Sequence, residues 1–218
     1  MGQKVNPKAF RLGVISTWSS RWFANSQNYK KFLLEDVKIR KALLLKLKPA
    51  GVAEIEIERS INKVDITLHV SRPGLVIGRG GQGMEEIKKF VENIIAVNDK
   101  KAKKDKKSQF KLELKVEPVK EPNLNAYIVG NLIADQLARR LPHKRVVNST
   151  IEKVMAAGAK GVKVMLSGRI AGAEISRREK YHQGSIPLST IRENVDFAVV
   201  PSLTKSGFIG VKVWICRN

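Results

Sequence analysis

The spacing of apolar residues predicts alternating helices and strands along the first half of the chain. Apolar positions recur at helical intervals over residues 28–48 and again over residues 84–97. Over residues 52–59 and 64–70 they alternate with polar positions, which predicts a hairpin with one buried face. Residues 110–116 alternate in the same way and predict a third strand in this half.

The second half of the chain predicts two helices followed by three or four strands. One helix runs over about 123–141 and is stopped by Pro142, and the next ends at about residue 157 before Gly158. The strands are predicted at 161–167, 173–179, 208–215 and, as the optional fourth, 196–200. The whole pattern predicts an α+β fold, in which a helix, hairpin, glycine-rich loop, helix and strand precede a two-layer α/β domain with two helices packed on a mostly antiparallel sheet.

A short segment rich in proline and charge divides the two halves. We therefore expect a domain at 28–117, a linker at 118–122 and a second domain at 123–218. Residues 1–27 show no sustained period, which indicates an arm that docks on a partner. The aromatic residues of this arm, Trp18, Trp22 and Phe23, are expected to pack in a core more often than to stack on RNA bases.

Charge points to the kind of partner. The chain has 218 residues with 41 Lys and Arg against 20 Asp and Glu, a formal net charge of +21. An excess of this size favours a polyanion, and nucleic acid is the leading candidate. There is no apolar run long enough to span a membrane and no signal-peptide pattern at the start. We expect a cytoplasmic protein that is not integral to a membrane.

The few cysteine and histidine residues argue against a metal, a disulfide or a cofactor. Cys216 is the only cysteine and is expected to be a small buried hydrophobe beside Trp214 and Ile215. With three histidines in the chain, a Cys/His zinc site has too few ligands. We expect no cofactor, no small-molecule substrate and no enzymatic activity.

Residues 78–83 form a glycine-rich loop between a predicted strand and a predicted helix. They fit G-x-G-x-x-G, but the strand ends too early and a Lys-rich run occupies the place where a dinucleotide-binding domain has its ribose-binding acid. A Walker A loop is excluded because the dipeptide Gly-Lys does not occur. Nucleotide cofactor binding is therefore not expected.

The same loop fits the shorter G-x-x-G pattern of an RNA-binding KH module. Without side chains, Gly78, Gly80 and Gly81 let the backbone approach the sugar-phosphate of single-stranded RNA, and Arg79 adds a charged contact. Amides at the start of the next helix favour the same anion. Val76, Ile77 and the apolar side of helix 84–97 are expected to form a hydrophobic floor beneath the bases.

Four motifs, spread over nearly the whole chain and in the same order, resemble those of one family. They are Met1-Gly2-Gln3-Lys4-Val5-Asn6-Pro7 with Arg11-Leu12-Gly13, Arg72-Pro73-Gly74 with Val76-Ile77-Gly78, Gly158-Ala159-Lys160-Gly161 with Ser167-Gly168-Arg169, and Gly210-Val211-Lys212-Val213-Trp214-Ile215. The chain resembles the bacterial-type small-subunit ribosomal protein S-three family. The resemblance implies a type II KH domain, a place in the head of the small subunit, binding to rRNA, contacts with ribosomal proteins S-ten and S-fourteen, and a position lining the pore through which mRNA enters.

The resemblance also implies roles for particular basic residues. Arg139, Arg140, Lys144 and Arg145 surround a helix break, and Lys144 and Arg145 occupy two positions that face incoming mRNA in the family and assist its unwinding. Asn148 and Ser149 replace further basic residues, which predicts a weaker patch. Contacts with rRNA are expected from Lys4, Arg11, Arg169, Arg177, Arg178 and Lys180.

Three alternatives remain open from the sequence. A free-standing KH regulator of mRNA is the first, although such proteins are expected to carry several KH copies and this chain has one G-x-x-G. A DNA lyase, as in some eukaryotic relatives, needs a lysine with a lowered pKa near an acid. A peripheral membrane protein needs a basic amphipathic helix, which residues 28–48 fit in part.

The Lys-rich run at 100–107 is either a solvated loop or a further RNA contact.

Overall fold

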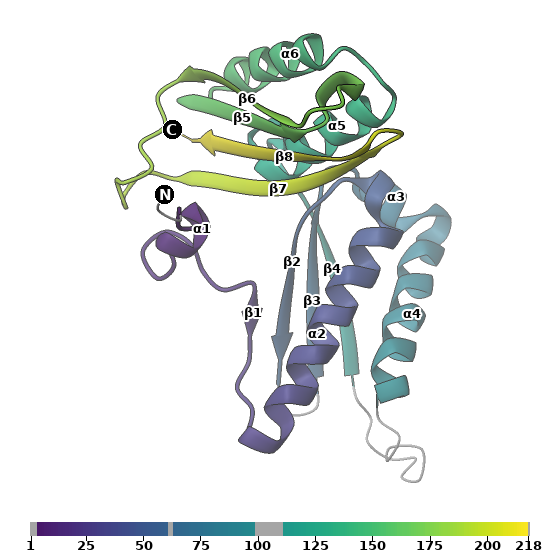
Figure 1. Cartoon of the computed structure of the whole chain (residues 1–218). Helices are drawn as coiled ribbons and strands as arrows, with labels where there is room; N and C mark the ends of the chain where they lie inside the picture. The colour runs from purple at the N-terminus through teal and green to yellow at the C-terminus, as the bar shows by residue number, and fades with distance from the viewer. Residues whose placement is uncertain (1–3, 61–62, 99–110, 218) are drawn as a thin grey trace. The chain divides into compact units, whose positions relative to one another are not determined.

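The chain folds into two compact units, each with its own core. The computed structural model describes residues 4–60, 63–98 and 111–217 (Figure 1). We call Trp18–Lys120 the N-terminal unit, and Met1–Thr17 together with Glu121–Asn218 the C-terminal unit. The predicted turn between the hairpin strands and the Lys-rich run at 100–107 fall wholly or partly outside the described residues.

The N-terminal unit contains a four-stranded sheet in the order β1-β2-β3-β4. Its strands are β1 (Ser20–Arg21), β2 (Val52–Arg59), β3 (Lys63–Val70) and β4 (Lys111–Pro118). The β2–β3 pair is antiparallel, which confirms the predicted hairpin, whereas β1 and β4 pair in parallel on either side. The strand predicted at 110–116 is therefore present as β4.

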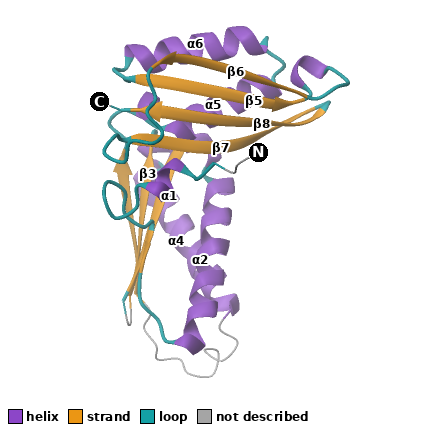
Figure 2. Ribbon diagram, turned by 60° about the vertical axis from the view of Figure 1, so that its left-hand side comes forward, coloured by secondary structure: helices purple, strands orange, loops and turns teal. Residues whose placement is uncertain are grey.

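Two long helices, α2 (Ser26–Lys46) and α4 (Gln82–Asn98), lie on one side of this sheet (Figure 2). Both confirm the helical spacing seen in the sequence. The core between helices and sheet includes Ile39 and Leu43 of α2 and Ile66 and Leu68 of β3, all completely buried. Alternation along the strands leaves the other face of the sheet to charged residues, because successive side chains point to opposite faces.

A short helix, α3 (Pro73–Ile77), was not predicted. The sequence Pro73-Gly74 indicated only a break after the strand, but proline is well suited to the first position of a helix because its missing N–H has no partner there. The chain then passes through a 3₁₀ turn, η2 (Arg79–Gly81), directly into α4. The glycine-rich loop is therefore held between two helices.

The C-terminal unit contains a second four-stranded sheet, in the order β6-β5-β8-β7, with every pair antiparallel. Its strands are β5 (Gly161–Gly168), β6 (Arg177–Gly184), β7 (Val195–Thr204) and β8 (Gly207–Cys216). The helices α5 (Ala126–Ala138) and α6 (His143–Ala156) pack on one face and share a core with it. The predicted antiparallel sheet with two helices is confirmed.

The start of α5 shows why the predicted helix 123–141 is too long. Residues 122–124 form a 3₁₀ turn, and the Asn125 side chain then accepts hydrogen bonds from the N–H groups of Tyr127 and Ile128 at 3.0 and 3.2 Å. Such a cap fixes the first turn of a helix. Asp196 of β7 accepts a further bond from the Ala126 N–H at 2.9 Å, which ties the helix to the sheet.

The strand predicted at 173–179 was placed too early. The observed strand β6 begins at Arg177, and the residues before it contain a 3₁₀ turn at Ile170–Gly172. The apolar residue that suggested a strand here, Ile175, is exposed. Pairing with β5 selects the later segment, because it sets Tyr181 opposite Val164 and Glu179 opposite Leu166.

Residues 4–25 are divided between the units. Helix α1 (Pro7–Phe10) and Arg11 belong to the C-terminal unit, whereas Ser20–Trp22 belong to the N-terminal unit. The Arg11 side chain is buried and donates hydrogen bonds to five backbone carbonyl groups. They belong to Pro7, Pro187, Leu188, Thr190 and Glu193, at 2.7–3.2 Å. The side chain that was expected to contact rRNA instead attaches α1 to the loop before β7.

Candidate RNA-binding surfaces

The glycine-rich loop has a backbone that other residues adopt with difficulty. Gly78, Gly80 and Gly81 have φ angles of 70°, 61° and 82°, in the left-handed region that favours glycine. A Cβ on Gly83 would lie 2.5 Å from the carbonyl oxygen of Val76, so this position has no room for a side chain. The glycines therefore allow α3 to pack closely against α4, and they also leave the backbone of the loop accessible.

The exposed residues of this loop differ in part from those expected. Arg79 is exposed, as an RNA contact requires. Val76, however, is completely buried, and helix α4 turns its apolar side into the core, so these residues cannot form a floor for bases. The apolar side chains available next to the loop are Leu75 and Ile77, which are both exposed.

The turn between α5 and α6 gathers the predicted mRNA-binding residues. Arg139 and Arg140 directly follow α5, Lys144 and Arg145 lie in the first turn of α6, and all four are exposed. That first turn has no acidic residue and no side-chain cap. A helix N-terminus favours negative charge, so cations at this place weaken the helix, by about 0.3–1 kcal/mol each at an exposed site. This turn is therefore better suited to an external anion than to stabilising the helix.

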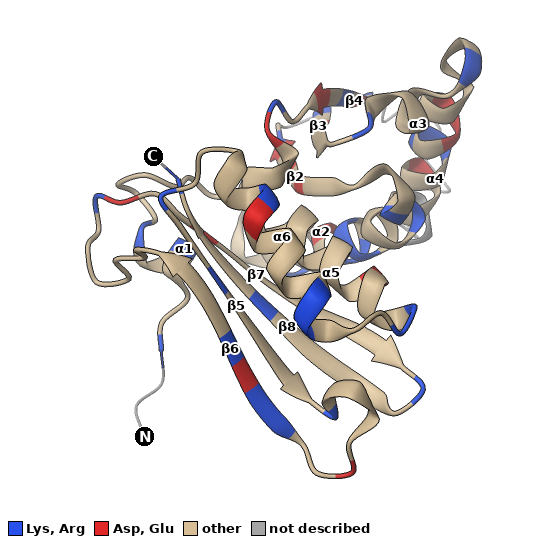
Figure 3. Ribbon diagram, turned by 90° about the horizontal axis from the view of Figure 1, so that it is seen from above, with Lys and Arg blue, Asp and Glu red and all other residues tan. Residues whose placement is uncertain are grey.

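The face of the C-terminal sheet that is turned away from α5 and α6 also carries cations. The register sets Arg178 opposite Ser167, Lys180 opposite Met165 and His182 opposite Lys163, so these side chains share that face. Figure 3 shows that the first part of β6 is basic and is interrupted by an acidic position. Burial lowers the pKa of Lys163, and the positive charges of Lys4 and Lys180 lower it further. The charged groups that face Lys163 are therefore cations, whereas a lyase lysine needs an acid.

On the other face of the same strand, Glu179 gathers three polar partners. Its carboxylate accepts hydrogen bonds from the Tyr181 hydroxyl at 2.5 Å and from Arg177 Nε at 2.7 Å, and His143 Nε2 lies 3.1 Å away. These bonds, the Tyr181 bond foremost, lower the pKa of Glu179, while burial and the Glu179 carboxylate raise the pKa of Tyr181 to about 12. Arg177 is thus paired within the protein.

The two remaining predicted contacts, Lys4 and Arg169, are exposed. Arg169 uses one donor within the chain, since its Nε donates to the Ala173 carbonyl at 2.8 Å. Arg169 also lines the edge of the cavity described below. Both side chains can reach a phosphate.

A buried charge network in the N-terminal unit was not predicted. Arg59 bonds Glu35 Oε2 at 2.9 Å and Asp36 Oδ1 at 2.5 Å, and all three side chains are at most 5% exposed. Trp22 donates its indole N–H to Asp36 at 2.7 Å and is half-buried against Tyr29 and Phe32, whereas Trp18 and Phe23 are exposed. A hydrophobic pattern does not reveal such a network, because its members lie on three separate elements.

Cys216 packs as the sequence predicted. It is completely buried in a small cluster with Val195 and Trp214, and burial raises the pKa of its thiol. Among the described residues, no three His, Cys, Asp or Glu side chains are grouped so as to hold a metal ion. No helix in the described ranges is long and apolar enough to cross a membrane.

Comparisons with known proteins agree with this architecture. The KH domain family matches residues 38–124, and the family described as ribosomal protein S3, C-terminal domain, matches residues 133–215. The fold and its exposed cations therefore define an RNA-binding ribosomal protein with a KH domain.

Full-length relatives identify the family. Small ribosomal subunit protein uS3 of Clostridium acetobutylicum is 45% identical over 215 residues, which cover 99% of this chain and 91% of that protein. The uS3 protein of Acetivibrio thermocellus is 45% identical and that of Dehalococcoides mccartyi 39% identical, each over all 218 residues and over 91% and 74% of the relative. The chain belongs to the uS3 family of small-subunit ribosomal proteins, which are structural components and not enzymes.

Proposed function

We propose that this uS3 protein lies in the head of the small subunit and lines the pore through which mRNA enters, where it holds the message and assists its unwinding. The observation that carries this proposal is the α5–α6 turn. It presents Lys144 and Arg145 in a first helical turn that has neither an acidic residue nor a side-chain cap. Phosphate contacts of this kind hold RNA independently of its sequence.

In this proposal, Arg139 and Arg140 extend the same basic surface towards the end of α5. The exposed Asn148 and half-buried Ser149 on the next turn of α6 add no charge, so the patch is short. The energy for unwinding comes from translocation, and the protein supplies the contacts that keep single strands apart.

The other exposed cations are proposed to bind rRNA. They are Arg79 with Gly78, Gly80 and Gly81 in the N-terminal unit, and Lys4, Arg169, Arg178 and Lys180 in the C-terminal unit. We assign Arg11 and Arg177 a structural role instead. The Arg11 side chain donates its hydrogen bonds to backbone carbonyl groups, and Arg177 donates to the Glu179 carboxylate. Ribosomal proteins S-ten and S-fourteen are the proposed protein neighbours.

The test compares ribosomes that carry Lys144→Ala/Arg145→Ala with wild-type ribosomes on two messages, one with a stable hairpin and one without. The proposal predicts slower translation of the structured message alone. Lys153→Ala is the matched control, because this lysine is exposed on the same helix and lies outside the basic turn. Equal rates on the structured message would overturn the proposed role in unwinding.

A further inference from the structure

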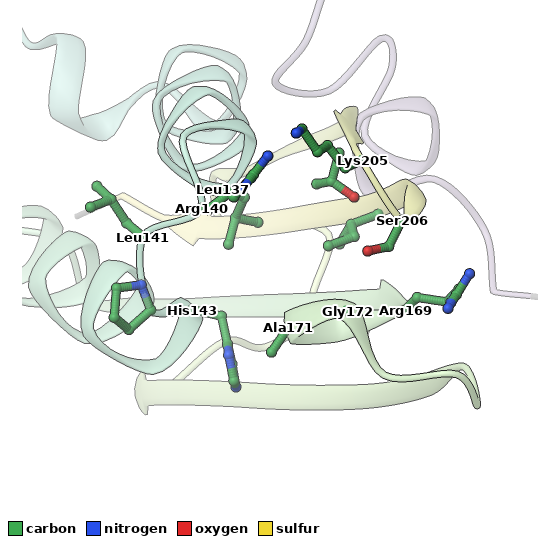
Figure 4. A pocket seen from close by; sticks show the side chains of 12 residues that line it. Leu137, Arg140, Leu141, His143, Arg169, Ala171, Gly172, Lys205 and Ser206 are labelled. Atoms are coloured by element: carbon green, nitrogen blue, oxygen red, sulfur yellow. The ribbon is translucent and has the colours of Figure 1, made fainter.

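A cavity of about 410 Å³ lies within the C-terminal unit, beside the α5–α6 turn (Figure 4). Three turns that are distant in sequence form it. Arg140 comes from the α5–α6 turn, Arg169 follows β5, and Lys205 with Ser206 forms the β7–β8 turn. A volume of several hundred Å³ is typical of sites for small organic groups and is much larger than a single ion needs.

The charge around this cavity has one sign. Arg140, Arg169 and Lys205 are all exposed and line it, and none of the described residues that line it is acidic. Three cations without a carboxylate repel one another, so an anion held between them would relieve this repulsion. The carboxylate of Glu179, which lies 3.1 Å from the lining residue His143, is bound by Tyr181 and Arg177.

The floor of the cavity is apolar. Leu137 and Ile209 line it and are 6% and 5% exposed, and the half-exposed Leu141 stands at its edge. An inorganic phosphate would leave such a floor unused. A flat aromatic group joined to a phosphate would cover the floor and reach the cations at the same time.

The backbone around the cavity is strained. In the described part of the chain, the non-glycine residues with positive φ are Arg140 at 62° and Ala171 at 57°, and both line this cavity. Such conformations cost of the order of 1–3 kcal/mol each and cluster at binding sites. The coincidence supports a site in which these two turns are shaped for a ligand.

We propose that this cavity holds one unpaired ribonucleotide of an RNA strand. Its base lies on Leu137, Leu141 and Ile209, and its phosphate lies among Arg140, Arg169 and Lys205. Ser206 offers a hydroxyl to the sugar or the base edge. The inference rests on the proposed RNA-binding function and extends it from backbone contacts to capture of a base, which single-stranded RNA permits because its bases can turn outward.

The first test measures binding of the full chain to a uridine oligomer and to an oligomer of equal length that has the same phosphates but no bases. We expect the wild-type protein to bind the uridine oligomer about tenfold more tightly, because base contacts in other RNA-binding proteins strengthen binding by about this factor. Ser206→Phe fills the cavity and leaves every cation in place, so it should abolish this preference. Ser206→Ala is the control and should keep it.

A second variant covers the case in which Ser206→Phe does not fold. Arg140→Asn/Lys205→Gln removes two cations at exposed turns, and asparagine tolerates the left-handed backbone at residue 140. It should weaken binding of both oligomers more than Lys115→Gln/Lys153→Gln, which removes two exposed cations elsewhere. If the wild-type protein binds both oligomers equally, or the two double variants behave alike, the cavity proposal is overturned. If the wild-type protein binds neither oligomer, the proposed RNA-binding function fails as well.

A third experiment identifies the source of the nucleotide. Small subunits assembled with the Ser206→Phe or Arg140→Asn/Lys205→Gln protein are probed chemically without mRNA, and are then crosslinked to mRNA that contains 4-thiouridine. A newly reactive rRNA position indicates rRNA, and a lost mRNA crosslink with an unchanged rRNA pattern indicates mRNA. No change in either measurement contradicts the proposal.

Discussion

The open faces of the two sheets, those turned away from the helices, carry net charges of opposite sign. In the N-terminal sheet, alternation and register place six carboxylates on this face, those of Glu54, Glu56, Glu58, Asp65, Glu113 and Glu117, among the four cations Arg21, Lys63, Lys111 and Lys115. In the C-terminal sheet the charged residues on this face are Lys163, Arg178, Lys180 and Lys212, and none of the described strand positions there is acidic. The excess of 41 basic over 20 acidic residues is therefore distributed very unevenly over the fold.

The difference extends to how each cation is neutralised. In the N-terminal sheet, Lys63 bonds Asp65 at 3.0 Å and Glu113 at 2.8 Å, and Arg21 pairs with Glu56 and Glu58. In the α5–α6 turn and on the open face of the C-terminal sheet, the cations have no such partners among the contacts described above. Cations that are paired within the protein stabilise its structure, whereas cations that are left unpaired on one surface are available for phosphate.

The largest predicted effect breaks the pairing in the N-terminal unit. Arg59→Ala leaves the carboxylates of Glu35 and Asp36 buried without their cation, so the free energy of unfolding should fall by about 3–5 kcal/mol. Urea unfolding measures it. Arg21→Ala, which breaks a half-exposed pair on the same unit, should cost less than about 1 kcal/mol. Similar losses for the two variants would contradict the structural role of the buried network.

The next effect concerns the buried arginine of the C-terminal unit, which is held without carboxylates. Arg11→Ala leaves buried carbonyl groups without donors and should lower the free energy of unfolding by about 2–3 kcal/mol. Arg178→Ala, at an exposed position, should change it by less than about 0.5 kcal/mol. If Arg11→Ala left stability unchanged and weakened RNA binding, the assignment of Arg11 to structure would be wrong.

A smaller effect is expected at Glu179, the paired carboxylate of the C-terminal sheet. Its folded-state pKa is lowered, so its charged form stabilises the fold above the ordinary carboxyl pKa, and this contribution is lost as the pH falls through the lowered value. Glu179→Gln should therefore lower the melting temperature at pH 7, and the difference from the wild-type protein should shrink as the pH falls below about 4.5. A difference that is independent of pH would contradict the ionic role.

The smallest effect is expected for the exposed pairs of the N-terminal sheet. Lys63→Gln/Lys111→Gln removes two cations whose side chains are 36% and 74% exposed. Because exposed ion pairs contribute little, the urea midpoint should move only slightly. A large loss would show that these exposed pairs hold the sheet together, and the comparison between the units would then need revision.

Much of the fold could be predicted from the sequence, because regular elements leave a periodic signal. The hairpin β2–β3 and the helices α2 and α4 have that signal, and the observed elements match the predictions closely. Helix α3 is too short to show a period, and the true start of β6 depends on its pairing with β5. Long-range pairing of this kind is not recorded in local spacing.

The candidate site could be predicted only where it lies on one segment. The G-x-x-G loop and the basic α5–α6 turn are continuous in sequence, and the structure places their charged residues on the surface. The burial of Arg11 could not be seen, since its acceptors other than Pro7 lie more than 170 residues further along the chain. The cavity was missed for the same reason, because residues 140, 169 and 205 meet only in the folded unit.

The salt dependence of RNA binding tests the central claim most directly, because its slope counts the phosphates that the protein neutralises. The logarithm of the affinity for a single-stranded RNA is measured against the logarithm of salt concentration for the wild-type protein, Lys144→Gln/Arg145→Gln and Lys63→Gln/Lys111→Gln. If unpaired cations of the α5–α6 turn bind phosphate, the slope of the first variant should become shallower by about 1.4, the value for two lost contacts on a single strand. The second variant should keep the wild-type slope. An unchanged slope in the first variant, or an equal change in both, would contradict the account.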